Sequence, residues 1–374
     1  MNMNPKERLL TTLDHEEPDK VPLTTRLWLD TLLKLRKKFG VNTDEEVYEK
    51  LGIESDRVVI GVSPPAHWEP TSEFLEFCTE TGYDVRGQHT TYEEWGIKRS
   101  LGLKIPERAL RQFYFIQHPW EQFTEASQIG EVELPDLDES GRFKQVMEAV
   151  KEYQDYRLVF GDLGHCQWTK AWELRGMMTF MKDLHTNLTM AEAILDRLND
   201  YFLDMAERLL DIGVEGLRFS EDWGNNKSMF INPEMWRKIF KPRYKRLFDA
   251  TKRRGGFVYF HSDGNITPIV GDLVEIGIDI LNPVQPECMN QLEVKEKYGD
   301  KITIDTGISV QRTLPYGTIE DVKRETMNAL KHLAPGGGFC YGTSHYALGD
   351  VPVENIVALY DTCRKYGKYP IRIP

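Results

Sequence analysis

The 374-residue sequence lacks the features of a membrane or secreted protein. No apolar run approaches the ~20 residues that cross a bilayer. The first residues, MNMNPKERLLTTLDHEEPDKVPL, contain acidic side chains where a secretory signal has an apolar core and a small-residue cleavage site. We therefore expect no membrane association and a cytoplasmic location.

Cysteine and positive charge are also scarce. Cys78, Cys166, Cys288, Cys340 and Cys363 are scattered and never form a CxxC pair, which predicts reduced thiols rather than a disulfide framework or a zinc knuckle. The 47 basic residues are outnumbered by 59 acidic ones, and the net charge of -12 argues against a nucleic-acid surface. The expected partners are small molecules or proteins, and a homodimer is left open.

What the sequence does contain is a regular alternation of strand-like and helix-like segments. Short β-branched or aromatic runs occur at residues 21–25, 58–62, 157–162, 216–222, 257–263, 279–284, 301–307 and 339–345. Between them lie amphipathic segments such as residues 189–213, whose apolar side chains recur three and four apart. Strand, helix, strand, repeated, predicts parallel strands with right-handed crossovers. Eight strand candidates predict a (β/α)8 TIM barrel.

The domain organisation follows from the same pattern. No Gly/Ser-rich linker or internal repeat separates a second domain, so residues 1–374 are predicted to form one barrel domain. Residues 64–135 alternate aromatic and polar side chains, and three prolines (Pro64, Pro65 and Pro70) mark the start of this stretch. We interpret it as an irregular hairpin insertion in the N-terminal part of the barrel.

Polar side chains follow most of the predicted strands. They are His165, Glu221, Asp222, His261, Asp263, Asn282, Gln285, Asp305 and His345. Catalytic groups of such barrels lie at the C-terminal ends of the strands, and imidazole with carboxylates can hold a divalent metal or transfer protons. Simpler interpretations remain open, because Asp before Gly favours a turn and a histidine at a strand end often only donates to a loop. Cys340 fits a buried small apolar residue.

Five segments of the chain resemble the uroporphyrinogen decarboxylase superfamily, which also contains corrinoid-dependent methyltransferases. They are ERLLTTLDHEEPDKVPL (7–23), GVEGLRFSEDWGNNKSMFINPEMWRKIFKPRYKRL (213–247), FHSDGNITPIVGDLVEIGIDILNPVQ (260–285), ITIDTGISVQRTLPYGTIEDV (302–322) and GGGFCYGTSHYALGDVPVENI (336–356). The resemblance covers essentially the whole chain in order. It implies a distorted (β/α)8 barrel with its cleft at the C-terminal rim.

Two departures bear on the reaction that the resemblance implies. True decarboxylases carry an arginine-rich signature after the first strand, whereas VPLTTRLWLD (21–30) retains only Arg26. The thiol-activating methyltransferases bind zinc through a His-x-Cys pair and a later Cys. In this chain His261, Asp263 and His345 stand at the corresponding positions. Two imidazoles and a carboxylate suit Zn²⁺ but also admit iron or manganese.

The resemblance thus implies methyl transfer between a small methylated compound or carrier and a methylcobamide on a separate corrinoid protein. His261 and His345, with Asp263 or Glu221, would hold the metal. Asp222, Glu221, Asp305 and His345 are the catalytic candidates, with Asp222 expected to face the cleft and Glu221 to face away. The substrate-binding candidates are Arg26, Asn282 and Gln285, together with Trp172, Trp223 and Tyr346 on an apolar wall.

Two other functions fit the same residues. One is a metal-free decarboxylase, in which Asp222 or His345 donates the proton. The other is a non-catalytic barrel that binds a tetrapyrrole or corrinoid.

Overall fold

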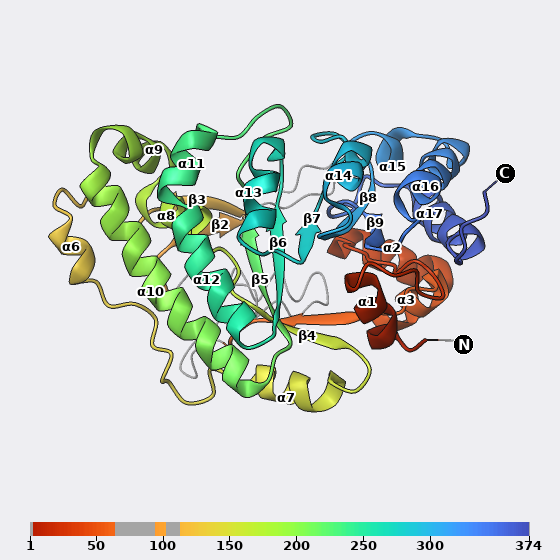
Figure 1. Ribbon diagram of the computed structural model, residues 1–374, viewed down its shortest axis with the longest axis horizontal. Coiled ribbons are helices and arrows are strands. Elements are labelled where there is room, and N and C mark those ends of the chain that lie inside the picture. The colour runs from red at the N-terminus through yellow and green to blue at the C-terminus, as the bar shows by residue number, and fades with distance from the viewer. Residues whose placement is uncertain (1–2, 64–93, 102–112, 374) are drawn as a thin grey trace.

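A seven-stranded parallel sheet lies at the centre of the computed structural model, which describes residues 3–63, 94–101 and 113–373 (Figure 1). Its strands, in their order across the sheet, are β1 (Arg57–Ile60), β4 (Leu158–Asp162), β5 (Gly216–Glu221), β6 (Phe257–Ser262), β7 (Ile280–Asn282), β8 (Thr303–Ile308) and β9 (Phe339–Thr343). Strands β4 to β9 are buried on both faces, as parallel sheets covered by helices are, whereas β1 at the edge is partly exposed. Seven of the predicted strand segments therefore form the sheet.

Helices surround this sheet, and the result is a distorted (β/α)8 barrel, as predicted. Figure 1 shows α10 and α12 on one side of the strands and α16 and α17 on the other. The helices are α1 (Pro5–Leu13), α2 (Leu29–Phe39), α3 (Asp44–Leu51), α6 (Ser127–Gly130), α7 (Lys144–Tyr153), α8 (Trp168–Arg175), α9 (Met177–Thr186), α10 (Leu188–Ile212), α11 (Pro233–Ile239), α12 (Lys241–Arg253), α13 (Val270–Glu275), α14 (Gln291–Tyr298), α15 (Thr313–Tyr316), α16 (Ile319–Leu333) and α17 (Val353–Tyr366), with a 3₁₀ turn at Thr267–Ile269. Among the described helices, none combines the length and apolar character that a membrane crossing needs.

Residues 21–25, the first predicted strand along the chain, do not form a regular strand, and that prediction was wrong. The segment lies beside β9 through single parallel bridges, Leu23 to Tyr341 and Leu27 to Ala347. Pro22 has no N–H to donate, although its carbonyl accepts from the Tyr341 N–H at 3.0 Å. No pairing between this segment and β1 occurs within the described residues, so the barrel is open along that seam.

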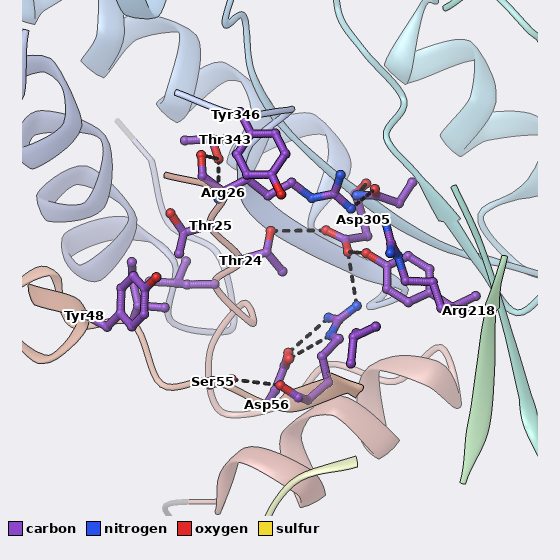
Figure 2. Close-up of a pocket in the computed structure, with 16 residues that line it drawn as sticks. Thr24, Thr25, Arg26, Tyr48, Ser55, Asp56, Arg218, Asp305, Thr343 and Tyr346 are labelled. Carbon is purple, nitrogen blue, oxygen red and sulfur yellow. Dashed lines mark hydrogen bonds and ion pairs between the residues drawn. The ribbon is translucent and has the colours of Figure 1, made fainter. Parts of the chain in front are cut away.

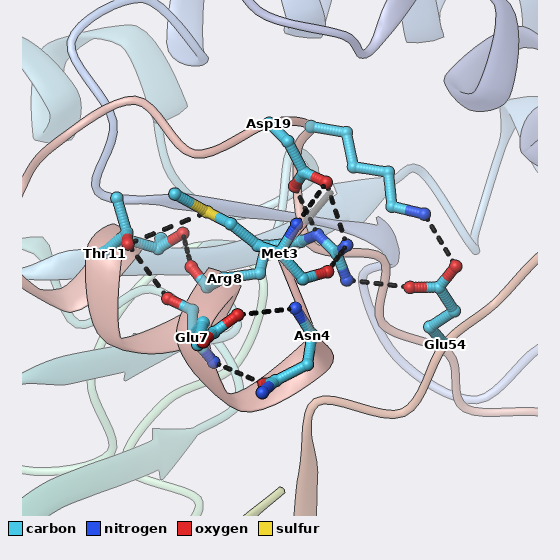
Figure 3. Close-up of polar contacts among 9 residues, drawn as sticks. Met3, Asn4, Glu7, Arg8, Thr11, Asp19 and Glu54 are labelled. Carbon is cyan, nitrogen blue, oxygen red and sulfur yellow. Dashed lines mark hydrogen bonds and ion pairs between the residues drawn. The ribbon is translucent and has the colours of Figure 1, made fainter. Parts of the chain in front are cut away.

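The N-terminal end of the barrel is closed by α1. Its Leu9 and Leu13 pack with Leu158, Tyr259, Ile280 and other buried residues at the starts of the strands. A capping box between Asn4 and Glu7 begins the helix. Arg8, 3% exposed, ties the helix to Asp19 at 2.7 Å and Glu54 at 2.8 Å (Figure 3). Because this end is filled, the C-terminal rim is the accessible end.

An antiparallel pair, β2 (Lys98–Leu101) and β3 (Phe113–Gln117), lies within the stretch interpreted as a hairpin insertion. Residues 64–93 and 102–112 fall outside the described residues, and so do the three prolines that mark its start. The insertion at 64–135 and the single-domain boundary at 1–374 stay predictions.

Candidate metal centre

Three side chains from the ends of β6 and β9, two strands that β7 and β8 separate in the sheet, meet at the C-terminal rim. His261 is the penultimate residue of β6, Asp263 follows its end, and His345 lies two residues after β9. One ligand atom from each lies within 4.8 Å of the others. Nε2 of His345 is 3.1 Å from Oδ2 of Asp263, and Nε2 of His261 is 3.6 Å from Oδ1. This geometry brings the three predicted ligands together.

Asn282 determines which nitrogen of His261 faces the cluster. Its Oδ1 accepts from the Arg26 guanidinium at 2.8 Å, and its Nδ2 donates to the Asp305 carbonyl at 2.9 Å, so the amide orientation is defined. Nδ1 of His261 lies 2.7 Å from the same Oδ1, so Nδ1 carries the ring proton and donates a hydrogen bond to that oxygen. Nε2 is thereby left unprotonated and directed at Asp263, as in histidines that bind metals.

The protonation states of the cluster are compatible with metal ligation. Burial, together with nearby arginine charges, lowers the pKa of His261 well below its usual value and that of His345 to about 3, so both imidazoles are neutral. Burial and the neighbouring Asp222 raise the pKa of Asp263 to about 7. Oδ1 of Asp263 is buried and has no hydrogen-bond partner. Neutral imidazoles and an unsatisfied carboxylate oxygen are a donor set that fits a divalent metal.

The turn after β6 places Asp263 in this position. Gly264 has φ +86°, and a Cβ there would overlap the carbonyl of Gly224, so only glycine fits. Gln285 Oε1 accepts from the Gly264 N–H at 2.9 Å, and Asp222 Oδ1 accepts from the Asp263 N–H at 3.3 Å. Asp222 and Gln285 therefore hold Asp263 in the cluster through the backbone of the turn.

The Glu221 side chain points away from the cluster. Its carboxylate is fully buried and accepts from the backbone N–H groups of Gln167 at 2.7 Å and Thr169 at 2.8 Å, at the N-terminus of α8. This is the favourable position for a negative charge at a helix end. The structure thus places Glu221 outside the cluster and beside α8.

The three aromatic candidates lie in different surroundings. Trp223 is fully buried and packs against Trp168 and Phe240, so it cannot line a cleft. Trp172 is half-buried against the core. Tyr346 contacts the His345 ring edge-on, with 5.1 Å between ring centroids, and lies beside the rim.

A cavity of about 500 Å³ lies next to the cluster, along the open seam of the barrel (Figure 2). Its walls carry Leu23, Thr24, Thr25, Arg26, Tyr48, Ile53, Ser55, Asp56, Arg57, Val59, Arg218, Tyr259, Asn282, Asp305, Thr343 and Tyr346. Asp305, 2% exposed, accepts from Thr24, Arg57 and Tyr259 at 3.1, 3.1 and 2.8 Å. The role of Tyr259 was not foreseen, although it precedes His261 by two residues and so shares its strand face.

A second cluster of polar side chains lies around Glu173, which is fully buried on α8 and was not among the residues singled out from the sequence. One carboxylate oxygen lies 2.7 Å from Nδ1 of His165 and the other 2.9 Å from the Lys170 ammonium. Burial by itself lowers the pKa of His165, but the Glu173 carboxylate outweighs burial and raises it above the usual value. The i, i+3 spacing of Lys170 and Glu173 was the available sequence signal.

Comparison with known proteins agrees with this architecture. A methyltransferase from Methanosarcina mazei superposes with a TM-score of 0.67 at 20% sequence identity, over 97% of this chain and 99% of that chain. A glycosylated endo-beta-1,4-xylanase from Gloeophyllum trabeum gives a TM-score of only 0.36 at 10% identity, over 60% of this chain and 81% of that chain. No curated protein sequence matches. The family model for uroporphyrinogen decarboxylase (URO-D) matches residues 118–366, and the chain belongs to this family.

Proposed function

We propose that the protein is a metal-assisted methyltransferase, which moves a methyl group between a small methylated compound and a corrinoid on a partner protein. The observation that carries the proposal is the cluster of His261, Asp263 and His345 with the unsatisfied Oδ1 of Asp263. The likeness in fold to the Methanosarcina mazei methyltransferase supports the reaction class.

Each residue of the site has its own role in this proposal. The cluster would hold the metal, which when bound would act as a Lewis acid on the oxygen or sulfur of the substrate. Asn282 keeps Nε2 of His261 available, and Asp222 holds the Asp263 turn. Arg26 and Tyr346 lie on the wall of the adjoining cavity, where a substrate would be oriented.

Metal analysis of the untagged protein tests the first half of the proposal. Protein purified without added metal should contain close to one divalent ion per chain by mass spectrometry. His261→Ala and His345→Ala should each lose it while circular dichroism and thermal unfolding stay close to wild type. His332→Ala, at an exposed helix position, is the matched control and should retain the metal. Wild-type metal content in His261→Ala after dialysis would show that the site is wrong.

Methyl transfer is tested with free cob(I)alamin as acceptor. Anaerobic incubation with methanol, methylamines or methoxybenzoates should give methylcobalamin, followed by its absorbance, with at least one donor. The rate should depend on the bound metal. A metal-loaded protein that methylates no cobalamin with any of these donors would count against the reaction while leaving the metal centre intact.

A further inference from the structure

Arg26 is a half-buried cation that contacts no carboxylate of the described residues. Its guanidinium donates to the neutral amide of Asn282 at 2.8 Å, and no carboxylate of the described chain forms an ion pair with it. The other two arginines of the cavity are paired. Arg57 contacts Asp56 at 2.8 Å and Asp305 at 3.1 Å, and Arg218 contacts Asp162 at 3.0 Å. Among the described residues, Arg26 is thus the cavity arginine with no carboxylate in direct contact, and the charges of Asp305 and Asp263 act on it only from farther away.

The charge of the whole cavity wall agrees with this. It carries three guanidinium groups, of Arg26, Arg57 and Arg218, and two carboxylates, of Asp56 and Asp305. Both carboxylates contact Arg57, and Arg218 contacts Asp162 outside the wall, so Arg26 is the cation left without a carboxylate contact among the described residues. Withdrawing a cation from water without a counter-ion is costly, so an unpaired one facing a cavity points to a ligand that supplies the charge. Guanidinium is suited to this role because it stays charged and can donate two parallel hydrogen bonds to one carboxylate.

We propose that the cavity binds a small molecule with a single anionic group, such as a carboxylate, that pairs with Arg26. This rests on the proposed function, because the molecule would be the substrate of the adjoining metal centre. The connection is short: Arg26 and His261 share the same oxygen of Asn282, at 2.8 and 2.7 Å. The anionic end lies at Arg26, and the remainder of the molecule extends toward the rim, past Tyr346.

The same walls select against a second negative charge. Asp56 and Asp305 are on the cavity surface and are held there by Arg57 (Figure 2). A dianion would bring its second charge against these carboxylates, and the described wall has no further cation without a carboxylate contact to receive it. Neutral molecules would leave Arg26 unpaired. A monoanion is therefore the class that balances the site.

Isothermal titration calorimetry on the full-length, zinc-loaded protein tests this. The probes are 3-methoxypropanoate and benzoate, their uncharged amides, and the dianion succinate. We expect at least one monoanion to bind at least tenfold more tightly than its amide and than succinate. Arg26→Gln should abolish that preference. Arg312→Gln, which removes a charge from an exposed loop after β8, should keep it.

The proposal is overturned if neither acid binds, if acid and amide bind alike, or if Arg26→Gln keeps the preference. Ligand-free stability gives a second readout. Arg26→Gln should melt at or above the wild-type temperature, whereas Arg57→Gln should melt below it because two carboxylates lose their partner. A drop in Arg26→Gln as large as that in Arg57→Gln would make Arg26 a structural cation and refute the proposal.

The outcome can be separated from that of the proposed function by measuring zinc in every sample. Loss of the preference in Arg26→Gln with zinc retained supports the anion site. Wild-type protein that prefers the acid but neither holds metal nor transfers methyl groups would refute the proposed reaction and leave the anion site standing.

Discussion

Asn282 is a single neutral side chain that controls the proposed metal ligand His261. Its one oxygen accepts hydrogen bonds from both Arg26 and His261, so it fixes the tautomer of the histidine. We predict that Asn282→Ala weakens Zn²⁺ binding by about 10- to 100-fold, the usual cost of losing such a support. Competition with a chromogenic chelator measures the affinity. Asn226→Ala, an exposed rim position, should leave it unchanged; equal affinities for the two variants would contradict the assignment.

Glu173 is the residue through which pH should act on stability. Burial by itself favours its neutral form, but Lys170 and His165 lower its pKa to about 2. A depressed carboxyl pKa contributes stability above the unfolded value of about 4.3, and this contribution is lost as the pH falls from there toward 2. Breaking a buried pair typically costs about 3 kcal/mol.

We therefore predict that Glu173→Gln lowers the free energy of unfolding by about 3 kcal/mol at pH 7, and that the difference from wild type shrinks below about pH 4. Urea unfolding at a series of pH values measures it. Glu192→Gln, on the exposed face of α10, is the control and should differ little from wild type at any pH. A pH-independent difference for Glu173→Gln would show that charge is not the cause.

At the scale of elements, the weak point of the barrel is the contact between residues 21–27 and β9. Gly342 lies where a Cβ would overlap the carbonyl oxygen of Thr24, so the close approach needs glycine. This contact also positions Arg26, whose backbone N–H donates to the Thr343 hydroxyl at 2.9 Å. The irregular segment is thus held by sterics and a few hydrogen bonds rather than by a full ladder.

Gly342→Ala should lower the free energy of unfolding by about 2 kcal/mol or more, because the added methyl forces the segment away from β9. It should also weaken the carboxylate binding assigned to Arg26. Gly130→Ala, where a Cβ meets nothing within 4 Å, is the control for a glycine replaced without a clash. The two variants are compared by chemical denaturation. If they are equally stable, the close packing at Gly342 is not decisive.

For the molecule as a whole, the family to which it belongs raises the question of uroporphyrinogen itself. That substrate carries eight carboxylates, and a pocket that removes water from them must supply several cations. Here the cavity wall offers one arginine, Arg26, that has no carboxylate contact among the described residues. The field is therefore unfavourable for such a polyanion.

We predict that the purified protein does not convert uroporphyrinogen III to coproporphyrinogen. Anaerobic incubation followed by chromatography, with an authentic decarboxylase run in parallel, measures this. Turnover comparable to that enzyme would contradict the charge argument and favour the metal-free decarboxylase, in which Asp222 or His345 donates the proton.

Much of the fold could be predicted because it depends on local pattern. Buried parallel strands are rich in β-branched and aromatic residues, so β5, β6, β8 and β9 were recognisable from their composition and from the helical segments between them. The family resemblance is confirmed by the match over residues 118–366. The placement of His261, Asp263 and His345 at strand ends was also local, since each directly follows or ends such a run.

Tertiary structure alone decided how these residues act. The sequence cannot say that Glu221 turns to the α8 N-terminus while its neighbour Asp222 holds the Asp263 turn, because both directions depend on segments more than 40 residues away. Nor does it show that Arg26 meets Asn282 across 256 positions, or that the seam beside residues 21–27 stays open. A strand can be recognised from the residue pattern of one short segment. The partner of a charged side chain, in contrast, depends on which segments distant in the sequence fold next to it.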